Sequence, residues 1–350
     1  MIYIKIVSVF FGLFCIAATL LPILKNEAWW IRICDFPRLQ LIFISFITLV
    51  PFFYKFDQRY STYIFLFFLC SCIVYQIIRI YPYTPLAKPQ VLISQKKENN
   101  QNSISIIVCN VMMTNKNSRK CIENINKKDP DIILLLEADK WWQAELEELE
   151  KEYLFKVQVP LANTYGMLLY SKLKLVNPVV NYLIETDVPS IHCKVELRSG
   201  DQIMFHGIHP RPPSPQESKS SLPRDAELIV VGKSCKASNL PNIVAGDLND
   251  VAWSHSTHLF QRISNLLDPR IGRGMYSTFN ANYFFLRWPL DHVFISREFK
   301  LLAMERLQSI ESDHFPIYAK FSFEPEMKHE QPAASSEDKK EAQEKIEKTY

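Results

Sequence analysis

Residues 242–249 read N-I-V-A-G-D-L-N, and the expectations for the rest of the chain start from this stretch. The apolar run before Gly246 predicts a buried strand that ends at the glycine. Asp247 and Asn249 follow at once and are two residues apart, so in an extended segment both side chains point the same way. A carboxylate and a carboxamide beyond a buried strand can activate a water molecule and stabilise an anionic oxygen. The alternative is an ordinary polar turn, in which Asp and Asn are common.

Other predicted strands in residues 103–324 also lie next to a residue that can bind a metal or transfer a proton. These residues are Asn110, Glu137, His209, Asp291, Asp313 and His314. Each has an ordinary alternative by itself, such as an acid at a helix N-terminus, a turn before proline or a charge at a strand edge. Their joint appearance at strand ends favours a single catalytic site.

Residues 103–324 are enough for one substantial core, and their pattern predicts an α+β fold with two sheets packed face to face and helices outside. Strand-like and helix-like stretches alternate early, and strands dominate later. The sequence Ser199-Gly200 predicts a hairpin between two of the strands. The expected strands are residues 103–109, 131–136, 166–170, 191–197, 202–209, 243–245, 290–296, 300–306 and 315–323, and the expected helices are 115–127, 140–153, 225–236 and 258–267.

The first 80 residues predict a membrane anchor of three transmembrane helices. Residues 6–24, 39–54 and 61–78 carry no charge, and each stretch is near the roughly 20 residues that cross a bilayer. Tyr, Trp and cationic residues lie at the ends of these stretches, as they do at membrane interfaces. The alternative is a signal peptide followed by core helices, but two further apolar segments follow the first and no clear cleavage site is present.

The remaining composition is less informative. Residues 81–102 are rich in Pro, Gln, Lys and Asn and predict a linker, and residues 325–350 predict a disordered charged tail. The eight cysteines show no C-x-x-C or metal spacing. A net charge of +3 is too small to indicate a nucleic-acid surface. The distribution of Lys and Arg around the apolar stretches does not decide on which side of the membrane the later domain lies.

The residues at the strand ends match a family pattern. In order, the matching pieces are I-I-V-C-N ending at Asn110, I-L-L-L-E ending at Glu137, Y-G-M-L-L-Y-S at 165–171, H-P-R-P-P from His209, G-D-L-N, L-D-H-V-F-I-S at 290–296 and S-D-H-F-P from Ser312. The sequence resembles the endonuclease/exonuclease/phosphatase superfamily, the group of DNase I, neutral sphingomyelinases and inositol-polyphosphate 5-phosphatases. The three-helix leader and the H-P-x-P-P form look like a bacterial branch anchored in the inner membrane. The resemblance implies a four-layered α/β sandwich (DNase I-like) and Mg²⁺-dependent phosphoester hydrolysis.

The resemblance also implies the ligands of the metal. Glu137 is the expected Mg²⁺ ligand, Asn110 lies beside it on the metal or on a phosphate oxygen, and Asp313 completes the site. Hard oxygen ligands suit Mg²⁺, with Mn²⁺ as the alternative ion.

The same resemblance implies five catalytic roles. Asp247 orients or deprotonates the attacking water, and Asn249 donates a hydrogen bond to the developing pentacovalent phosphate. His314 donates to the phosphate oxygens, and Asp291 fixes its tautomer and raises its basicity. His209 is a second donor near the scissile phosphate.

The chain departs from the pattern in some places. Residues 111–113 are Val-Met-Met where relatives that cut DNA often have another polar group. Tyr165 and Tyr170 are only candidates for the aromatic hydroxyl that some members point at the phosphate. Trp253 and the segment F-F-L-R-W at 284–288 either line a rim that faces bases or lipid, or pack under a loop.

Three classes of function follow from these observations. A metal-dependent nuclease comes first, because it is the commonest activity of the superfamily. A phosphoesterase that acts on a phospholipid head group is the alternative, suggested by the bilayer anchor. A catalytically idle membrane binding module is the third, although none of the matched acids or histidines is lost. A strongly basic face would favour the nuclease, and an apolar rim facing the bilayer would favour the phosphoesterase.

Overall fold

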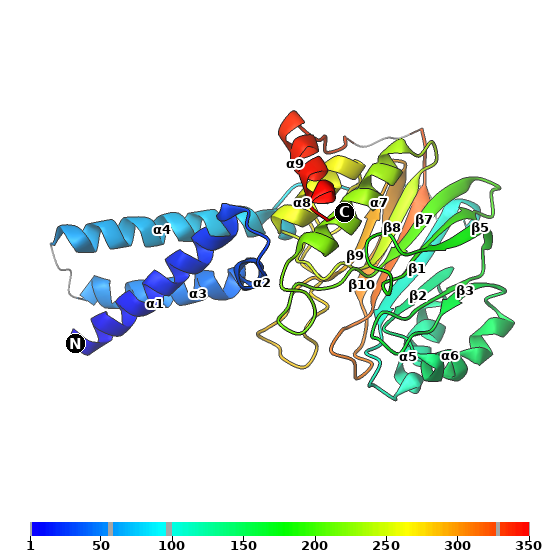
Figure 1. Ribbon diagram of the computed structural model, residues 1–350, viewed down its shortest axis with the longest axis horizontal. Coiled ribbons are helices and arrows are strands. Elements are labelled where there is room, and N and C mark those ends of the chain that lie inside the picture. Colours follow the sequence, from blue (N-terminus) through cyan, green and yellow to red (C-terminus); the bar gives the residue numbers. More distant parts are fainter. Residues whose placement is uncertain (1, 55–58, 96–99, 327–329, 350) are drawn as a thin grey trace.

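The computed structural model describes residues 2–54, 59–95, 100–326 and 330–349. A stalk of helices forms one end of the molecule and a β-sandwich forms the other (Figure 1). The stalk consists of α1 (Ile2–Leu20), α3 (Arg38–Tyr54) and α4 (Tyr60–Ile80), together with the turn η1 (Leu21–Leu24), the short helix α2 (Trp29–Arg32) and the turn η2 (Ile33–Asp35).

The sandwich contains two β-sheets. The six-stranded sheet has the order β10-β11-β1-β2-β4-β3, and the five-stranded sheet has the order β5-β6-β7-β8-β9. The strands of the first are β1 (Ser103–Asn110), β2 (Ile132–Leu136), β3 (Phe155–Val159), β4 (Met167–Ser171), β10 (Phe299–Arg306) and β11 (Ile317–Phe323). Those of the second are β5 (Lys174–Asn181), β6 (Ser190–Glu196), β7 (Gln202–Ile208), β8 (Asn242–Asp247) and β9 (Asp291–Ile295).

Alternation of side chains along the strands creates the four layers. On β1, Ile104, Ile106 and Val108 face the other sheet, whereas Ile107 and Cys109 face outward. The outer face of the six-stranded sheet is covered by α5 (Ser118–Lys128), α6 (Lys140–Glu145) and η5 (Glu147–Lys151). The outer face of the five-stranded sheet is covered by α7 (Leu222–Ala237) and α8 (His255–Ser264). The predicted α+β sandwich is therefore confirmed (Figure 1).

The sheets confirm one predicted feature and contain two strands that the sequence did not predict. The hairpin at Ser199-Gly200 joins β6 and β7, which pair antiparallel as predicted. Strands β3 and β5 were not predicted, because both are largely half-exposed or exposed and β5 contains Pro178 and a register shift. Strands of this kind lack the apolar run or the regular alternation that marks a buried strand in a sequence.

Each sheet contains one parallel pair of strands, and these pairs position the site. Strand β1 pairs parallel with β2, and β7 pairs parallel with β8. Because neighbouring parallel strands end at the same edge of a sheet, Asn110 lies beside the end of β2, and His209 lies beside the end of β8. Strand β9 runs antiparallel to β8, with Asp247 opposite Asp291.

The predicted linker differs in the structure. The described part of residues 81–102 packs against the sandwich, beginning with the turn η3 (Tyr81–Tyr83). Tyr83 is buried, and its hydroxyl donates to the carbonyl of Ala252 over 2.5 Å. Val91 is part of the core between the sheets. Residues 96–99 of the predicted linker lie outside the described residues.

The tail predicted to be disordered also differs. Residues Ser336–Glu347 form α9, which begins with a capping box between Ser335 and Asp338. The helix lies against α7 and α8 (Figure 1). Nζ of Lys345 is buried and lies 3.0 Å from Oδ2 of Asp225, and Glu341 contacts His255. The charged composition hides this docking, because the partners that fix the helix come from distant parts of the chain.

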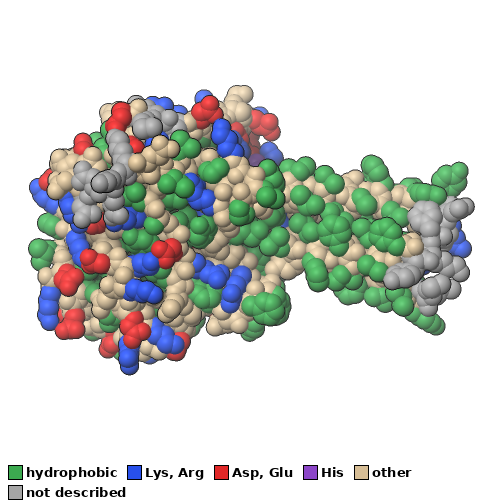
Figure 2. Space-filling view, turned by 180° about the vertical axis from the view of Figure 1, so that it is seen from behind, with side chains coloured by type: hydrophobic (Ala, Val, Ile, Leu, Met, Phe, Trp, Pro, Cys, Tyr) green, Lys and Arg blue, Asp and Glu red, His purple; other side chains and the backbone are tan. Residues whose placement is uncertain are grey.

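The stalk is apolar and exposed. Two of its helices, Tyr3–Leu24 and Tyr60–Tyr83, are long and apolar enough to cross a membrane. The bent pair Trp29–Asp35 and Arg38–Phe53, at 74°, makes a third candidate among the described residues if it counts as one span. Hydrophobic side chains cover the stalk and continue onto the neighbouring surface of the sandwich (Figure 2).

The end of β8 requires glycine. Gly246 has a φ of 151°, and a Cβ at this position would lie 1.8 Å from the carbonyl oxygen of Ile208. We expect Gly246→Ala to lower the stability by on the order of 2–4 kcal/mol, because it adds a backbone clash to an unfavourable conformation. The melting temperature of the purified full chain would then fall by roughly 5–15 °C.

Gly200→Ala is the matched control, because Gly200 also has a positive φ, of 89°, but no atom lies within 4 Å of the added Cβ. It should cost about 1 kcal/mol. Equal melting temperatures for the two variants would contradict the steric explanation.

Candidate active site

The edge of the sandwich where β1, β2, β7 and β8 end holds a cluster of polar side chains. Nδ2 of Asn110 donates to Oε1 of Glu137 over 2.8 Å and to Oδ2 of Asp247 over 3.2 Å. Asn110 thus joins a carboxylate of one sheet to a carboxylate of the other. Its own Oδ1 accepts from the backbone N–H of Met112, so the nitrogen and not the oxygen of this amide faces the carboxylates.

Asp247, His314 and Asp291 form a second part of the cluster, and all three are buried. Nδ1 of His314 donates to Oδ2 of Asp291 over 2.8 Å, and Nε2 of His314 lies 3.5 Å from Oδ2 of Asp247. Burial opposes a charge on His314, but the carboxylates of Asp291 and Asp247 outweigh it and raise the pKa of His314 to about 10. His314 is therefore a cation at neutral pH and acts as a hydrogen-bond donor, not as a base.

Asp247 and Asn249 at the end of β8 are held by several hydrogen bonds. Oδ1 of Asp247 accepts from the backbone N–H of Asn249, which has a φ of 51°. Asp247 lies at the end of β8 and is buried beside Asn110, His209 and His314. The amide of Asn249 donates to the carbonyl of Pro210 over 3.0 Å, which ties the end of β8 to the loop after β7.

Glu137 is the member of the cluster that best fits a divalent cation. Burial raises its pKa to about 7, and the negative charges of Asp313 and Asp247 also raise it, against the hydrogen bond from Asn110 and the charge of His314. A divalent cation beside Glu137 would offset this crowding of negative charge. Carboxylate oxygens of Glu137 and Asp313 are the hard ligands that Mg²⁺ binds. The residues present therefore fit a divalent metal at this place.

The three residues Asp247, Asp291 and His314 also offer ligand atoms that lie within 4.8 Å of one another. A protonated imidazole has no lone pair for a metal, because both of its nitrogens carry hydrogen. The raised pKa of His314 and its hydrogen bond to Asp291 therefore favour an Asp–His–Asp hydrogen-bonded chain in these three residues.

His209 follows β7 and faces the same cluster. Its Nε2 lies 3.9 Å from Oδ2 of Asp247, and burial lowers its pKa, so the ring is neutral at pH 7. Nδ1 of this buried ring has no hydrogen-bond partner among the described residues. The ring of Tyr165 lies 5.4 Å from the ring of His209.

The two tyrosine candidates do not point at the cluster. The hydroxyl of Tyr165 donates to Oε2 of Glu217, which also pairs with Arg211. The hydroxyl of Tyr170 accepts from Gln158 on the outer face of the six-stranded sheet. Tyr165 thus supports the position of His209, and Tyr170 lies away from the site.

The last loop is held to the first strand by Ser312. Its hydroxyl donates to the backbone carbonyl of Asn110 over 2.8 Å and accepts from the backbone N–H of His314. Asp313 lies between these two residues, and its carbonyl accepts from Ala281 over 2.6 Å. All the residues expected at the site therefore lie at strand ends and on the adjoining loops at one edge of the sandwich.

Supporting residues were not found from the sequence. Arg224 is fully buried, pairs with Asp225 and Asp250, and donates to the backbone carbonyl of Asn249 over 2.9 Å. Thr278 accepts from the backbone N–H of Asp291 over 3.2 Å. No spacing in the sequence links these residues to the site.

Trp253 packs under a loop. The side chain is buried against Tyr83, and Nε1 donates to the carbonyl of Asp35 in the stalk over 2.7 Å. Trp288 packs against Phe36 and Phe279. In contrast, Phe284 and Phe285 of the same F-F-L-R-W segment are exposed.

Residues 107–314 match the model of the endonuclease/exonuclease/phosphatase family. The chain belongs to this family. The matched range contains every residue of the cluster described above, and membership makes the protein a metal-dependent enzyme that hydrolyses phosphoesters.

Solved structures share the fold of this family member. TDP2 from D. rerio, in a complex with a single-strand DNA product, is 18% identical with a TM-score of 0.52, covering 63% of this chain and 99% of its own. The human Nocturnin catalytic domain with bound sulfate is 19% identical with a TM-score of 0.51, covering 64% of this chain and 95% of its own. An endonuclease/exonuclease/phosphatase from Beutenbergia cavernae is 16% identical with a TM-score of 0.52, covering 64% of this chain and 72% of its own. At these identities the likeness concerns the fold alone. No curated protein matches the chain.

The pKa of Glu137 predicts how pH and metal affect stability. Because the folded pKa of about 7 exceeds the ordinary value of 4.5, Glu137 is neutral at pH 5 and charged at pH 8 in the folded protein. Its contribution to stability is therefore present at low pH and is lost as the pH rises through 7. In EDTA, the free energy of unfolding of the wild type should fall by on the order of 2 kcal/mol more than that of Glu137→Gln as the pH rises from 5 to 8.

Thermal melts of both proteins measure this difference. The contributions of other buried acids to the pH dependence cancel, because both proteins contain these acids. Adding Mg²⁺ at pH 8 should raise the melting temperature of the wild type and not that of Glu137→Gln. An equal rise in both proteins would place the cation elsewhere.

Proposed function

We propose that this protein is a membrane-anchored, Mg²⁺-dependent phosphodiesterase that hydrolyses its substrate by attack of water. The observation that carries the proposal is the chain Asp291–His314–Asp247 beside the Asn110–Glu137 pair, with all five side chains at one edge of the sandwich. Membership of the family supplies the reaction class, and the exposed apolar stalk supports the membrane anchor.

Asp247 is the group that acts on the water in this proposal. It is the carboxylate that touches Asn110, His209 and His314, whereas Asp291 is engaged by His314 and Glu137 is the expected metal ligand. His314 is protonated at neutral pH and donates to the phosphate oxygens, and Asp291 holds its Nδ1–H and its orientation. A pentacovalent phosphate gains negative charge in the transition state, so a fixed imidazolium stabilises it more than the ground state.

Three other residues complete the proposed mechanism. Neutral His209 donates a hydrogen bond near the scissile phosphate. Asn249 holds Asp247 through its backbone N–H, and its amide is the proposed donor to the developing phosphate. Glu137 and Asp313 would hold the Mg²⁺, which as a Lewis acid would supply stabilisation of the charge on the phosphate and leaving group. Asn110 was expected on the metal or on a phosphate oxygen, but its oxygen is engaged by Met112 and its amide nitrogen donates to Glu137, so it orients this carboxylate.

The substrate class is the finer part of the proposal. The single-strand DNA product named for the D. rerio protein supports a nuclease. At an identity of 18%, however, the substrate of one protein cannot be inferred from that of the other. The exposed aromatic residues Phe284 and Phe285 lie on the stalk side of the sandwich, which favours a phosphoester held in a membrane.

Substitution of Asp247 tests the mechanism. Asp247→Asn keeps the shape of the side chain and removes the charge that draws off the proton. General-base catalysis contributes about 10²–10⁴-fold, so the turnover of a soluble phosphodiester such as bis(p-nitrophenyl) phosphate should fall by that order with little change in KM.

Asp250→Asn is the contrasting variant, three residues further on. Asp250 is a buried partner of Arg224, and breaking such a pair costs about 3–5 kcal/mol. We therefore expect a lower melting temperature for Asp250→Asn and a lower turnover for Asp247→Asn. A folded Asp247→Asn protein with full activity would contradict the assignment.

The proposed anchor has a testable topology. The backbone N–H of Trp29 donates to Lys219 over 3.0 Å, so the loop after α1 lies at the same end of the stalk as the sandwich. Reporter fusions after Lys25 and after Lys97 should report one side of the membrane, and a fusion after Arg59 the other. Opposite results for Lys25 and Lys97 would mean that the chain does not cross three times.

A further inference from the structure

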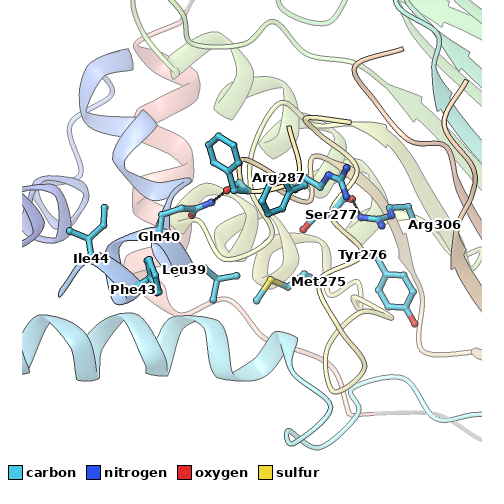
Figure 3. A pocket seen from close by; sticks show the side chains of 11 residues that line it. Leu39, Gln40, Phe43, Ile44, Met275, Tyr276, Ser277, Arg287 and Arg306 are labelled. Carbon is cyan, nitrogen blue, oxygen red and sulfur yellow. Dashed lines mark hydrogen bonds between the residues drawn. The ribbon is translucent and has the colours of Figure 1, made fainter. Parts of the chain in front are cut away.

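A large hollow lies where the stalk meets the sandwich (Figure 3). Its volume is about 1030 Å³, and it is bounded by the first turns of α3 and by residues 275–287, the segment before β9. The amide of Gln40 on α3 donates to the carbonyl of Phe285 over 2.5 Å, which fixes the two walls to each other. Pockets for small molecules usually measure about 300–1,000 Å³, so this hollow accommodates a ligand at or above that size.

One end of the hollow is apolar and continuous with the stalk. Leu39 and Phe43 of α3 line it together with Met275, Phe284 and Phe285. Phe284 is 80% exposed and Phe43 is 66% exposed. Large apolar side chains gathered on an exposed surface mark a site for a protein, a membrane or an apolar ligand. Because α3 belongs to the apolar stalk, the ligand that reaches this end most directly is an acyl chain of the bilayer.

The other end is cationic. The guanidinium groups of Arg287 and Arg306 lie over the ring of Phe315, at 4.9 and 4.5 Å from its centre. Each donates to a backbone carbonyl, of Ala281 and Ser277 respectively, and neither forms a salt bridge with a carboxylate among the described residues. Burial lowers the pKa of Arg306, and the charge of Arg287 lowers it further. Two neighbouring cations without a counter-charge fit an anionic group of a ligand.

The cationic end adjoins the candidate active site. Phe315 follows His314 directly, and its backbone N–H donates to Thr278 over 2.9 Å. The ring of Phe279 lies 4.9 Å from the ring of His314, and the N–H of Ala281 donates to Asp313. The segment that forms one wall of the hollow is thus also a wall of the site.

We propose that this hollow binds an anionic membrane phospholipid as the substrate, with an acyl chain along Leu39, Phe43 and Phe284, and that Arg287 and Arg306 attract the head group, whose phosphodiester is hydrolysed at the adjoining site. The proposal rests on the proposed function and deepens it by naming the substrate. A nucleic-acid strand would need cations along its whole backbone. The hollow instead has two cations at one end and an apolar wall shared with the stalk at the other.

The test uses the full chain in detergent micelles with three substrates: bis(p-nitrophenyl) phosphate, short-chain phosphatidylglycerol and a single-stranded DNA oligonucleotide. The variant Arg287→Gln/Arg306→Gln removes the cationic end. The control Arg119→Gln/Arg297→Gln removes the same charge from arginines that do not line the hollow. We expect Arg287→Gln/Arg306→Gln to lose about tenfold or more in kcat/KM for phosphatidylglycerol, and the control to keep the wild-type value.

A binding measurement separates this proposal from the proposed function. Phosphatidylglycerol with a photoreactive acyl chain, in nanodiscs with the full chain, should label residues 275–287, and the labelling should fall in Arg287→Gln/Arg306→Gln and in Phe43→Asp but not in the control. Absence of hydrolysis of every substrate would overturn the proposed function while the labelling still reports on the hollow. Cleavage of the oligonucleotide but not of the phospholipid, or labelling that the substitutions leave unchanged, would overturn the lipid proposal.

Discussion

The site depends on burying three carboxylates close together at one edge of a sandwich. Glu137, Asp247 and Asp291 repel one another in surroundings that screen charge poorly. Two neighbours make the arrangement stable: the imidazolium of His314 between Asp247 and Asp291, and the amide of Asn110 between Glu137 and Asp247. Removing either neighbour would leave buried negative charge without a partner. The same unbalanced charge gives the site its attraction for a divalent cation.

The layout of the strands follows from this constraint. Polar groups of two different sheets meet only because each sheet contains one parallel pair that ends at the shared edge. Gly246 brings the end of β8 against the backbone of Ile208, which no residue with a side chain allows. Arg224 then donates a hydrogen bond to the carbonyl of Asn249. The positions of the side chains at this edge thus depend on close contacts between backbone segments as well as on the side chains themselves.

The sequence was sufficient for the sandwich, because buried strands such as β1, β2 and β8 are short apolar runs with polar residues at their ends. It was also sufficient to predict that Asn110, Glu137, Asp247 and His314 lie together at strand ends. It was insufficient wherever structure depends on partners far away in the chain. Strand β5 is too exposed and irregular to leave a pattern, and α9 carries the composition of a disordered tail. Asp247 could be assigned to a strand end, but its burial comes with contacts to Asn110, His209 and His314, which lie far away in the chain.

The contacts of Trp253 have a consequence for how such an enzyme changes over evolutionary time. The indole donates to Asp35, and Tyr83 donates to Ala252, so the loop directly after the G-D-L-N stretch is packed against the end of the stalk. Val91, from the stretch that joins stalk and sandwich, is part of the central core. The helices are therefore not an interchangeable attachment. Loss or exchange of these helices would uncover the interior beside β8, so we expect stalk and sandwich to be retained together.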